Sequence, residues 1–325
     1  MTSAAPLVGS TLVMSLRSAL ATLAASCAAL VGCFGPEHLE PAAGGRDFAL
    51  QGEYVGEGFG AQVVALGAGR FLALLQSGGL PGAGADDSVP ALANGQDGGD
   101  AVALTGDFDG TLRDGTLRVR TAEGKAALLR RLVRESPTLG AAPPRGAVVL
   151  FDGSGTSAFA EGKLDPRGFL AAGARTRDAF GSFTLHLEFR TPFMPEANGQ
   201  WRGNSGVYLQ GRYEVQVLDS FGLAPELDGC GAIYAQRAPE RNMTFPPLSW
   251  QTYDVEFRAA SFDASGARTA PAALTLRHNG VVVHDAVELA GPTGRGEPEG
   301  AEPGPLLFQD HWNPVVYRNV WLVPR

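Results

Sequence analysis

The chain has 325 residues, of which 44% are hydrophobic, so it is long enough for about two domains that each bury a core. Its net charge is −8 and it contains no long run of Lys and Arg, which argues against a nucleic acid as partner because phosphate binding needs clustered basic side chains. The 44 glycines break helices and supply turns, so the composition favours many short strands.

The N-terminal segment is typical of an exported protein. An apolar stretch at residues 18–32 follows Arg17, the only charge before Glu37, and is too short to span a bilayer comfortably. It ends in LVGC, which resembles a bacterial lipobox with Cys33 as the lipidated residue. We therefore expect residues 1–33 to be a lipoprotein signal peptide. The mature chain would be a cell-envelope lipoprotein, membrane-bound through lipid, in the outer membrane or facing the periplasm. An ordinary signal peptide cut elsewhere, or a buried apolar segment, is the alternative.

Cysteine usage agrees with export. Cys27 leaves with the signal peptide and Cys33 takes the lipid, so Cys230 is left alone. A single thiol cannot close an internal disulfide. We expect Cys230 to be a small packed residue and not a nucleophile.

A small N-terminal β domain is predicted at residues 46–135, after a polar tether at residues 34–45. Its expected strands are residues 62–66, 71–75, 101–104 and 116–120. The Asp109-Gly110 and Asp114-Gly115 pairs are predicted as hairpin turns. Residues 78–100, rich in Gly and Asp, are predicted as a surface loop, and residues 126–133 suit either a strand or a helical turn.

A linker at residues 136–145, stiffened by Pro143-Pro144, leads to a second domain at residues 146–325. In residues 182–190 apolar and polar side chains alternate, which predicts a strand with one core face and one solvent face. Asn279-Gly280 is the strongest hairpin signal in the chain. Further strands are expected at residues 207–209, 213–218, 253–258, 273–277, 281–283 and 315–323. This pattern predicts an all-β, two-sheet antiparallel sandwich.

Several polar side chains on the predicted strands suit sugar chemistry. Glu214 and Gln216 share one face of a regular strand, whereas Asp219 falls on the opposite face unless a β-bulge precedes it. The other candidates are Glu188 and Arg190 on the strand at residues 182–190, Asn204 and Tyr208, Tyr234, and Gln309 and His311.

Six ordered motifs carry a family resemblance. They are VVLFDGSGTSAF, GNSGVYL, YEVQVLD, GAIY, LRHNGVVVHD and FQDHWNPVVYRNVWLVP. Each is weak alone, but their order over residues 146–325 resembles the 3-keto-disaccharide hydrolase family. The resemblance implies a concanavalin-like jelly-roll sandwich, and the N-terminal domain resembles a small β module that precedes some members. Trp312 stands where the family more often has glycine, so the loop there is expected to be reshaped.

The resemblance implies a substrate whose sugar is oxidised at C3. A base removes the acidified C2 proton, the leaving group departs from C1, and water adds to the enone. It implies Glu214 as the base, His311 as acid or enolate partner, and Asp219 as a residue that orients His311 or binds a cation. The implied substrate-binding residues are Glu188, Arg190, Asn204, Tyr208, Gln216, Tyr234 and Gln309.

Plainer structural roles stand beside these functional ones. Glu188 and Arg190 also suit a cross-strand ion pair, and Asp219 suits a turn cap. Gln309 and His311 suit turn residues, Asn204 a loop-shaping residue, and Tyr234 a core aromatic.

Two other functions fit the same fold. Glu214, Gln216 and Asp219 keep the spacing of the E-x-D-x-x-E strand of laminarinase-type endo-glucanases, with two of the acids altered. A non-catalytic carbohydrate-binding lipoprotein is the third reading.

No cofactor is predicted, although a divalent cation such as Ca²⁺ would suit acidic side chains beside a loop. The family also suggests a sugar 3-dehydrogenase as metabolic partner.

Overall fold

The computed structural model describes residues 35–86 and 88–325. The expected signal peptide and lipobox, including Cys33, lie outside these residues. In the described part of the chain, no helix is both long and apolar enough to cross a bilayer.

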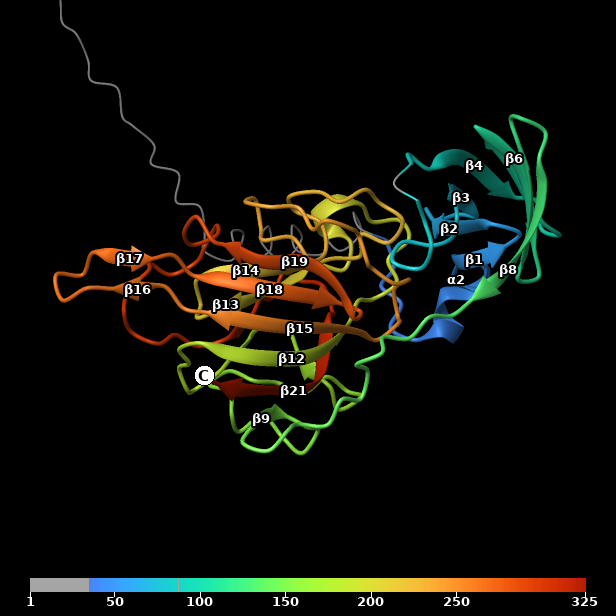
Figure 1. The fold of residues 1–325 in the computed structure, drawn as a ribbon. Coiled ribbons are helices and arrows are strands. Elements are labelled where there is room, and N and C mark those ends of the chain that lie inside the picture. Colours follow the sequence, from blue (N-terminus) through green and yellow to red (C-terminus); the bar gives the residue numbers. More distant parts are fainter. Residues whose placement is uncertain (1–34, 87) are drawn as a thin grey trace, which may run out of the picture. The chain divides into compact units, whose positions relative to one another are not determined.

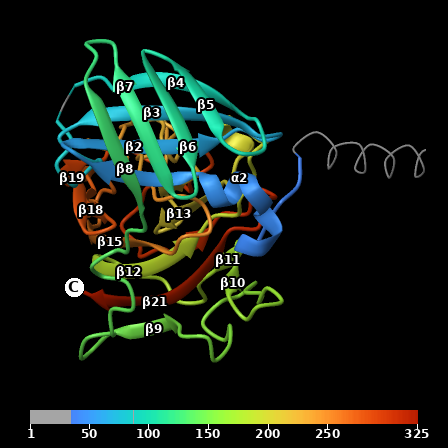
Figure 2. The same cartoon turned by 90° about the vertical axis from the view of Figure 1, so that its right-hand side faces the viewer.

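The first half forms a closed antiparallel β-barrel (Figure 1). A 3₁₀ turn, η1 (Pro41–Gly44), and a short helix, α2 (Gly45–Leu50), precede it. Strand β1 pairs with both β2 and β8, so the barrel has no free edge. Figure 2 shows its strands side by side. They are β1 (Gly52–Gly56), β2 (Phe59–Ala65), β3 (Arg70–Ser77), β4 (Ala91–Asp97), β5 (Val102–Gly106), β6 (Phe108–Arg113), β7 (Thr116–Thr121) and β8 (Ala126–Leu132).

Local turn signals gave mixed results in the barrel. Asp114 and Gly115 both have positive φ, at 49° and 70°, and connect β6 to β7 as predicted. The turn predicted at Asp109-Gly110 is wrong, because both residues lie inside β6 with φ outside the left-handed region. The predicted loop at residues 78–100 is also wrong in part. It contains β4, whose mostly small and polar residues gave no apolar alternation.

The second half is a β-sandwich, as predicted. Its larger sheet has the order β10-β21-β12-β15-β18-β19, with β9 also paired to β21, and its smaller sheet has the order β11-β20-β13-β14. The hydrophobic core includes Phe183, Leu185, Val207, Val215 and Val255. The strands are β9 (Val148–Phe151), β10 (Leu170–Ala171), β11 (Ala174–Arg175), β12 (Phe183–Arg190), β13 (Ser205–Leu209), β14 (Tyr213–Val217), β15 (Gln251–Arg258), β18 (Ala273–His278), β19 (Val281–Glu288), β20 (Leu307–Phe308) and β21 (Val316–Pro324), with a separate ribbon of β16 (Ser261–Phe262) and β17 (Arg268–Ala270).

The Asn279-Gly280 hairpin between β18 and β19 is confirmed, with φ values of 50° and 79°. The closing strand β21 is confirmed as well. Cys230 is buried and free, with its Sγ 3.1 Å from the Tyr253 hydroxyl, which fits a packed residue. The jelly-roll strand order stays a prediction.

Strand β12 was predicted correctly, but its solvent face was not. His186 and Glu188 are buried, at 1% and 0% exposure. Residues 138–141 cover them: the Gly140 amide donates to Glu188, and the Trp321 indole donates to the Ala141 carbonyl oxygen. The alternation of side chains within a strand cannot show that a segment more than 40 residues away buries its polar face.

Candidate functional site

The site is built on the face of β13 and β14 that points away from the hydrophobic core. In the antiparallel register Tyr208 pairs with Glu214 and Gly206 with Gln216. Because side chains alternate along a strand, Val207 and Val215 enter the core while Tyr208, Glu214 and Gln216 share the opposite face. The face that sequence alternation predicted for Glu214 and Gln216 is therefore present.

Loops close over this face and leave a cavity of about 210 Å³. Glu214 and His311 both line it, although 97 positions separate them in the chain. Among the predicted site residues, those that line the cavity are Asn204, Tyr208, Glu214, Gln216, Tyr234, Gln309 and His311. The other lining residues are Gln200, Gly294 and Arg295.

Glu214 is the only carboxylate among the residues that line the cavity, and it is 2% exposed. Burial raises its pKa to about 7, against the lowering effects of a hydrogen bond with Tyr208 and the positive charge of Arg295. Gly206 makes room for it, since a Cβ at that position would overlap the Glu214 carboxyl group. A carboxyl group with a pKa near neutrality suits proton transfer.

The Tyr208 hydroxyl has two acceptors within reach. It donates to the Gly294 carbonyl oxygen at 3.0 Å, and the carboxyl group of Glu214, whose pKa a hydrogen bond with Tyr208 lowers, is the alternative acceptor. A hydroxyl has one proton, so it can serve only one acceptor at a time. Burial and the charge of Glu214 raise the pKa of Tyr208, which keeps this proton in place. Tyr208 can therefore turn toward Glu214 whenever that carboxyl group ionises.

Amide side chains leave unpaired acceptors at the cavity. The Gln200 side-chain oxygen accepts from Asn204 Nδ2 and from Gln216 Nε2, each at 2.9 Å. These two bonds fix both amides by their NH₂ groups. In the described part of the chain, the buried polar atoms without a partner include Asn204 Oδ1, Gln216 Oε1, Gln309 Oε1 and His311 Nδ1. A buried acceptor without a hydrogen bond costs free energy unless a ligand donates to it, and hydroxyl groups are suitable donors.

Comparison with known protein families identifies the family of the second domain. Residues 146–323, more than half of the chain, match the family model of the 3-keto-alpha-glucoside-1,2-lyase-like domain. The chain belongs to this family. The resemblance drawn from the sequence motifs is thereby confirmed, and both the cavity and its lining residues lie inside the family domain.

Solved structures are similar to this chain over about half of its length. A Parabacteroides distasonis ATCC 8503 protein, assigned as a glycosyl hydrolase, is 30% identical with a TM-score of 0.51; the match covers 56% of this chain and 85% of that chain. A second protein from this organism with the same assignment is 17% identical with a TM-score of 0.40, covering 60% of this chain and 98% of that chain. No curated protein matches this chain.

Asp219 does not reach the cavity of the lyase-like domain. It lies beyond the end of β14, where its Oδ2 accepts from Arg202 Nε at 2.7 Å and its Oδ1 from the Phe221 amide at 3.4 Å. Both oxygens are thus engaged, as the turn-cap alternative requires. Within residues 35–86 and 88–325 there is also no cluster of three His, Cys, Asp or Glu side chains that would hold a metal ion.

Glu188 and Arg190 belong to the larger sheet and also lie outside the cavity. Glu188 faces Arg318 in the β12–β21 register, and Arg318 Nε donates to it at 2.6 Å. This is the cross-strand ion pair considered above, but with a different partner. Arg190 lies 5.2 Å from the Trp250 ring and donates to Glu40 at 3.2 Å.

Gln200 and Arg295 are cavity residues that sequence reasoning missed. Gln200 belongs to the 3₁₀ turn η2 (Gly199–Trp201), and Arg295 has a left-handed φ of 65° in a loop. Neither position lies on a strand, so no alternation marks it. The Gly294-Arg295-Gly296 sequence offers only a turn signal.

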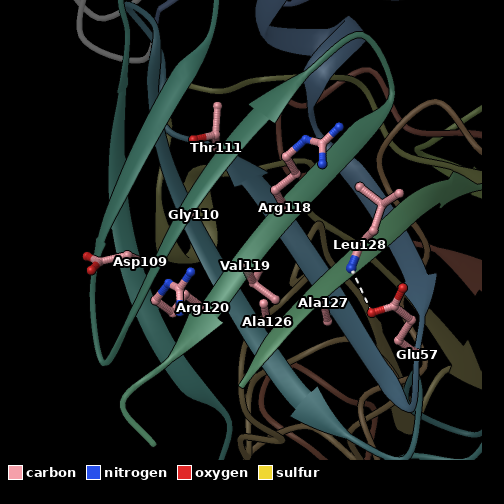
Figure 3. Close-up of a pocket in the computed structure, with 10 residues that line it drawn as sticks. All are labelled: Glu57, Asp109, Gly110, Thr111, Arg118, Val119, Arg120, Ala126, Ala127 and Leu128. Atoms are coloured by element: carbon pink, nitrogen blue, oxygen red, sulfur yellow. Dashed lines mark hydrogen bonds between the residues drawn. The ribbon is translucent and has the colours of Figure 1, made fainter. Parts of the chain in front are cut away.

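A wider hollow of about 460 Å³ lies over β6, β7 and β8 of the barrel. Figure 3 shows its charged side chains, Asp109, Arg118, Arg120 and Glu57, spread along the strands, with Glu57 accepting from the Leu128 amide. None of its lining residues carries a buried, unpartnered polar side-chain atom in the described part of the chain. The cavity of the lyase-like domain is therefore the better candidate.

Proposed function

We propose that this chain is a hydrolase of 3-keto-disaccharides or 3-keto-glycosides that works by elimination across C1 and C2, followed by hydration. The observation that carries the proposal is Glu214, a single buried carboxyl group with a pKa raised to about 7, in a cavity of unpaired hydrogen-bond acceptors. Family membership supports the same chemistry.

The first step is removal of the C2 proton. A ketone at C3 makes this proton acidic, because the electron pair of the broken C–H bond can move onto the C3 oxygen. Glu214 in its ionised form takes the proton. Arg295 lines the same cavity and lowers the pKa of Glu214 through its positive charge, and it would steady the negative charge that passes from Glu214 to the enolate.

The second step breaks the bond between C1 and the glycosidic oxygen. The enolate electrons re-form the ketone and make a C1–C2 double bond, and the leaving oxygen takes its electron pair and a proton from His311. Water then adds its hydroxyl to C1 and gives its remaining proton to His311, while Glu214 returns its proton to C2. The sum is hydrolysis, with no oxocarbenium ion.

Binding is assigned to the polar residues around Glu214. Asn204, Gln216 and Gln309 present carbonyl oxygens without partners, and these would accept hydrogen bonds from sugar hydroxyls. Tyr234 forms a further part of the wall. This set can orient one sugar ring with its C2 proton toward Glu214.

A laminarinase-type mechanism has less support. A retaining pair needs two carboxyl groups about 5–5.5 Å apart. The ten residues that line the cavity include Glu214 as their single carboxylate, and Asp219 is held by Arg202. A carbohydrate-binding role without turnover remains a second candidate, because unpaired acceptors would serve binding alone.

Three substrates separate these functions. The purified protein is incubated with 3-keto-trehalose, trehalose and an unmodified β-glucan, and sugar release is followed by chromatography. We expect release from 3-keto-trehalose alone. Release from β-glucan would support the glucanase, and binding without release from any of the three would support the lectin-like role.

We further propose that the mature protein is anchored to the cell envelope through Cys33 and receives its substrate from an oxidoreductase that makes the C3 ketone. The apolar residues 18–32 before the LVGC sequence support the anchor. We also propose that the sandwich has the concanavalin-like jelly-roll topology. Cys33→Ser should release the protein from the membrane fraction, and unchanged fractionation would contradict the anchor.

A further inference from the structure

Two exposed tryptophans flank His311 at the cavity. Trp201 is 42% exposed and Trp312 is 73% exposed. Each follows a cavity-lining residue in the chain, Gln200 and His311 respectively. Their rings contact the His311 ring at centroid distances of 5.7 Å and 5.5 Å, inclined by 62° and 60°. Two indole rings therefore border the residue assigned to protonate the leaving group.

The backbone holds Trp312 in an unfavourable conformation. Its φ is 58°, in the left-handed region that bulky side chains rarely adopt. Asp310 stabilises this conformation by accepting the Trp312 amide at 2.8 Å. Asn313 ties the same loop to the site, because its Oδ1 accepts the Asn204 amide at 2.8 Å. The loop thus holds Trp312 beside the site with its indole 73% exposed, where most of the ring is open to a ligand.

The size of the cavity leaves part of the substrate outside. Its volume is about 210 Å³, below the roughly 300–1,000 Å³ typical of sites that enclose drug-sized ligands. One sugar ring with its hydroxyls suits this space and its unpaired acceptors. The group attached to C1 must then extend past His311, where Trp201 and Trp312 lie.

We propose that Trp201 and Trp312 form a leaving-group subsite that binds the apolar face of a ring, either a second sugar or an aryl group. The proposal rests on the proposed function, because it takes His311 as the proton donor to the leaving oxygen. Aromatic side chains stack on such ring faces, and a stacking contact changes affinity by about three- to tenfold.

The test compares leaving groups of similar acidity. Benzyl and methyl 3-keto-α-glucosides release alcohols of similar acidity, so their chemistry matches while only the benzyl group offers a ring. A 3-keto disaccharide is the third substrate, and its leaving group is a sugar. For the wild-type protein we expect kcat/KM to be about three- to tenfold higher for the benzyl glucoside than for the methyl glucoside. A preference extending to the disaccharide identifies a second sugar, whereas benzyl preference alone identifies an aryl group.

The variants test whether the tryptophans cause this preference. Trp312→Gly suits the positive φ and should lower the benzyl-to-methyl ratio toward one, as should Trp201→Ala, whereas Trp312→Phe keeps a ring and should keep most of the ratio. Leu164→Ala, another exposed apolar position at 47% exposure, is the control and should leave the ratio unchanged. A wild-type ratio of one, or a ratio unchanged in both tryptophan variants, overturns the subsite.

Failure of the proposed function gives a different result. A wild-type protein that turns over none of the three substrates contradicts the hydrolase, and the subsite is then tested by calorimetric affinity for benzyl and methyl 3-keto-glucosides. Tighter binding of the benzyl compound that Trp312→Gly abolishes upholds the subsite. Equal affinities for both compounds overturn it.

Discussion

Tyr208 and Glu214 face each other as a register pair across β13 and β14, and each shifts the pKa of the other. The Glu214 charge helps burial to raise the pKa of Tyr208, while the hydrogen bond with Tyr208 opposes the effect of burial on the pKa of Glu214. Burial therefore raises the pKa of the cavity carboxyl group toward neutrality, and Tyr208 limits how far it rises.

The pH dependence of kcat/KM should follow the ionisation of Glu214. Its pKa is raised to about 7, so the carboxyl group is protonated and inactive as a base in acid. We expect kcat/KM for 3-keto-trehalose to rise with pH through about 7. A rate that is flat from pH 5 to 8, or that falls as pH rises through this range, would contradict Glu214 as the base.

Tyr208→Phe should move this titration. The variant loses the hydroxyl that stabilises ionised Glu214, so the pKa of Glu214 should rise and the acid limb of the pH profile should shift to higher pH. The shift is measured from kcat/KM against pH in both proteins. A uniform loss of activity at every pH, with the limb in place, would show that Tyr208 only binds substrate.

Glu214→Gln should stabilise the protein at alkaline pH. Because burial raises the pKa of Glu214 from 4.5 to about 7, its contribution to stability is present below pH 4.5 and is lost as pH rises toward 7. The loss amounts to about 3 kcal/mol, so urea unfolding at pH 8 should favour Glu214→Gln by a measurable margin that shrinks at pH 4.5. The exposed Glu161→Gln is the control. Equal differences at both pH values would contradict the buried, uncharged state.

The contribution of Glu188 to stability should depend on pH in the opposite direction. Burial alone would raise its pKa, but hydrogen bonds from His186, Asn319, Gly140 and Arg318 lower it from 4.5 to about 2. Its contribution, about 3 kcal/mol, is therefore present above pH 4.5 and lost as pH falls toward 2. Glu188→Gln should reduce the free energy of unfolding at pH 7 and flatten its dependence on pH below 4.5. An unchanged acid slope would mean that this network does not hold the charge.

His311→Ala should separate the two chemical steps. Without the proton donor, we expect C2 proton exchange to persist while leaving-group release falls by roughly 10²–10⁴-fold. A 4-nitrophenyl leaving group needs little protonation and should restore much of the rate. Equal losses with the methyl and 4-nitrophenyl 3-keto-glucosides would contradict His311 as the acid.

The sequence predicted the features whose signals are local. The Asn279-Gly280 hairpin and the shared face of Glu214 and Gln216 follow from turn chemistry and strand alternation, and both are present. The Asp109-Gly110 turn failed because the same residue types also fit a strand when their φ stays negative.

What the sequence could not supply was the identity of distant partners. Asp219 lies beyond the end of β14, where Arg202 binds it, and Glu188 lies on the larger sheet, where Arg318 faces it from β21. Gln200 and Arg295 reach the cavity from loops, where neither periodicity nor spacing indicates direction. These placements depend on how segments far apart in the chain pack in the sandwich. No short pattern in a single sequence encodes that packing.

The central claim is that Glu214 removes the C2 proton of a 3-keto sugar, and proton exchange tests it most directly. Wild-type protein and Glu214→Gln are incubated with 3-keto-trehalose in deuterated water, and NMR follows deuterium at C2 beside release of glucose. We expect rapid exchange and release with the wild-type protein, and both should fall by at least about 10²-fold in Glu214→Gln, although the variant stays folded. Wild-type exchange in Glu214→Gln would contradict the account.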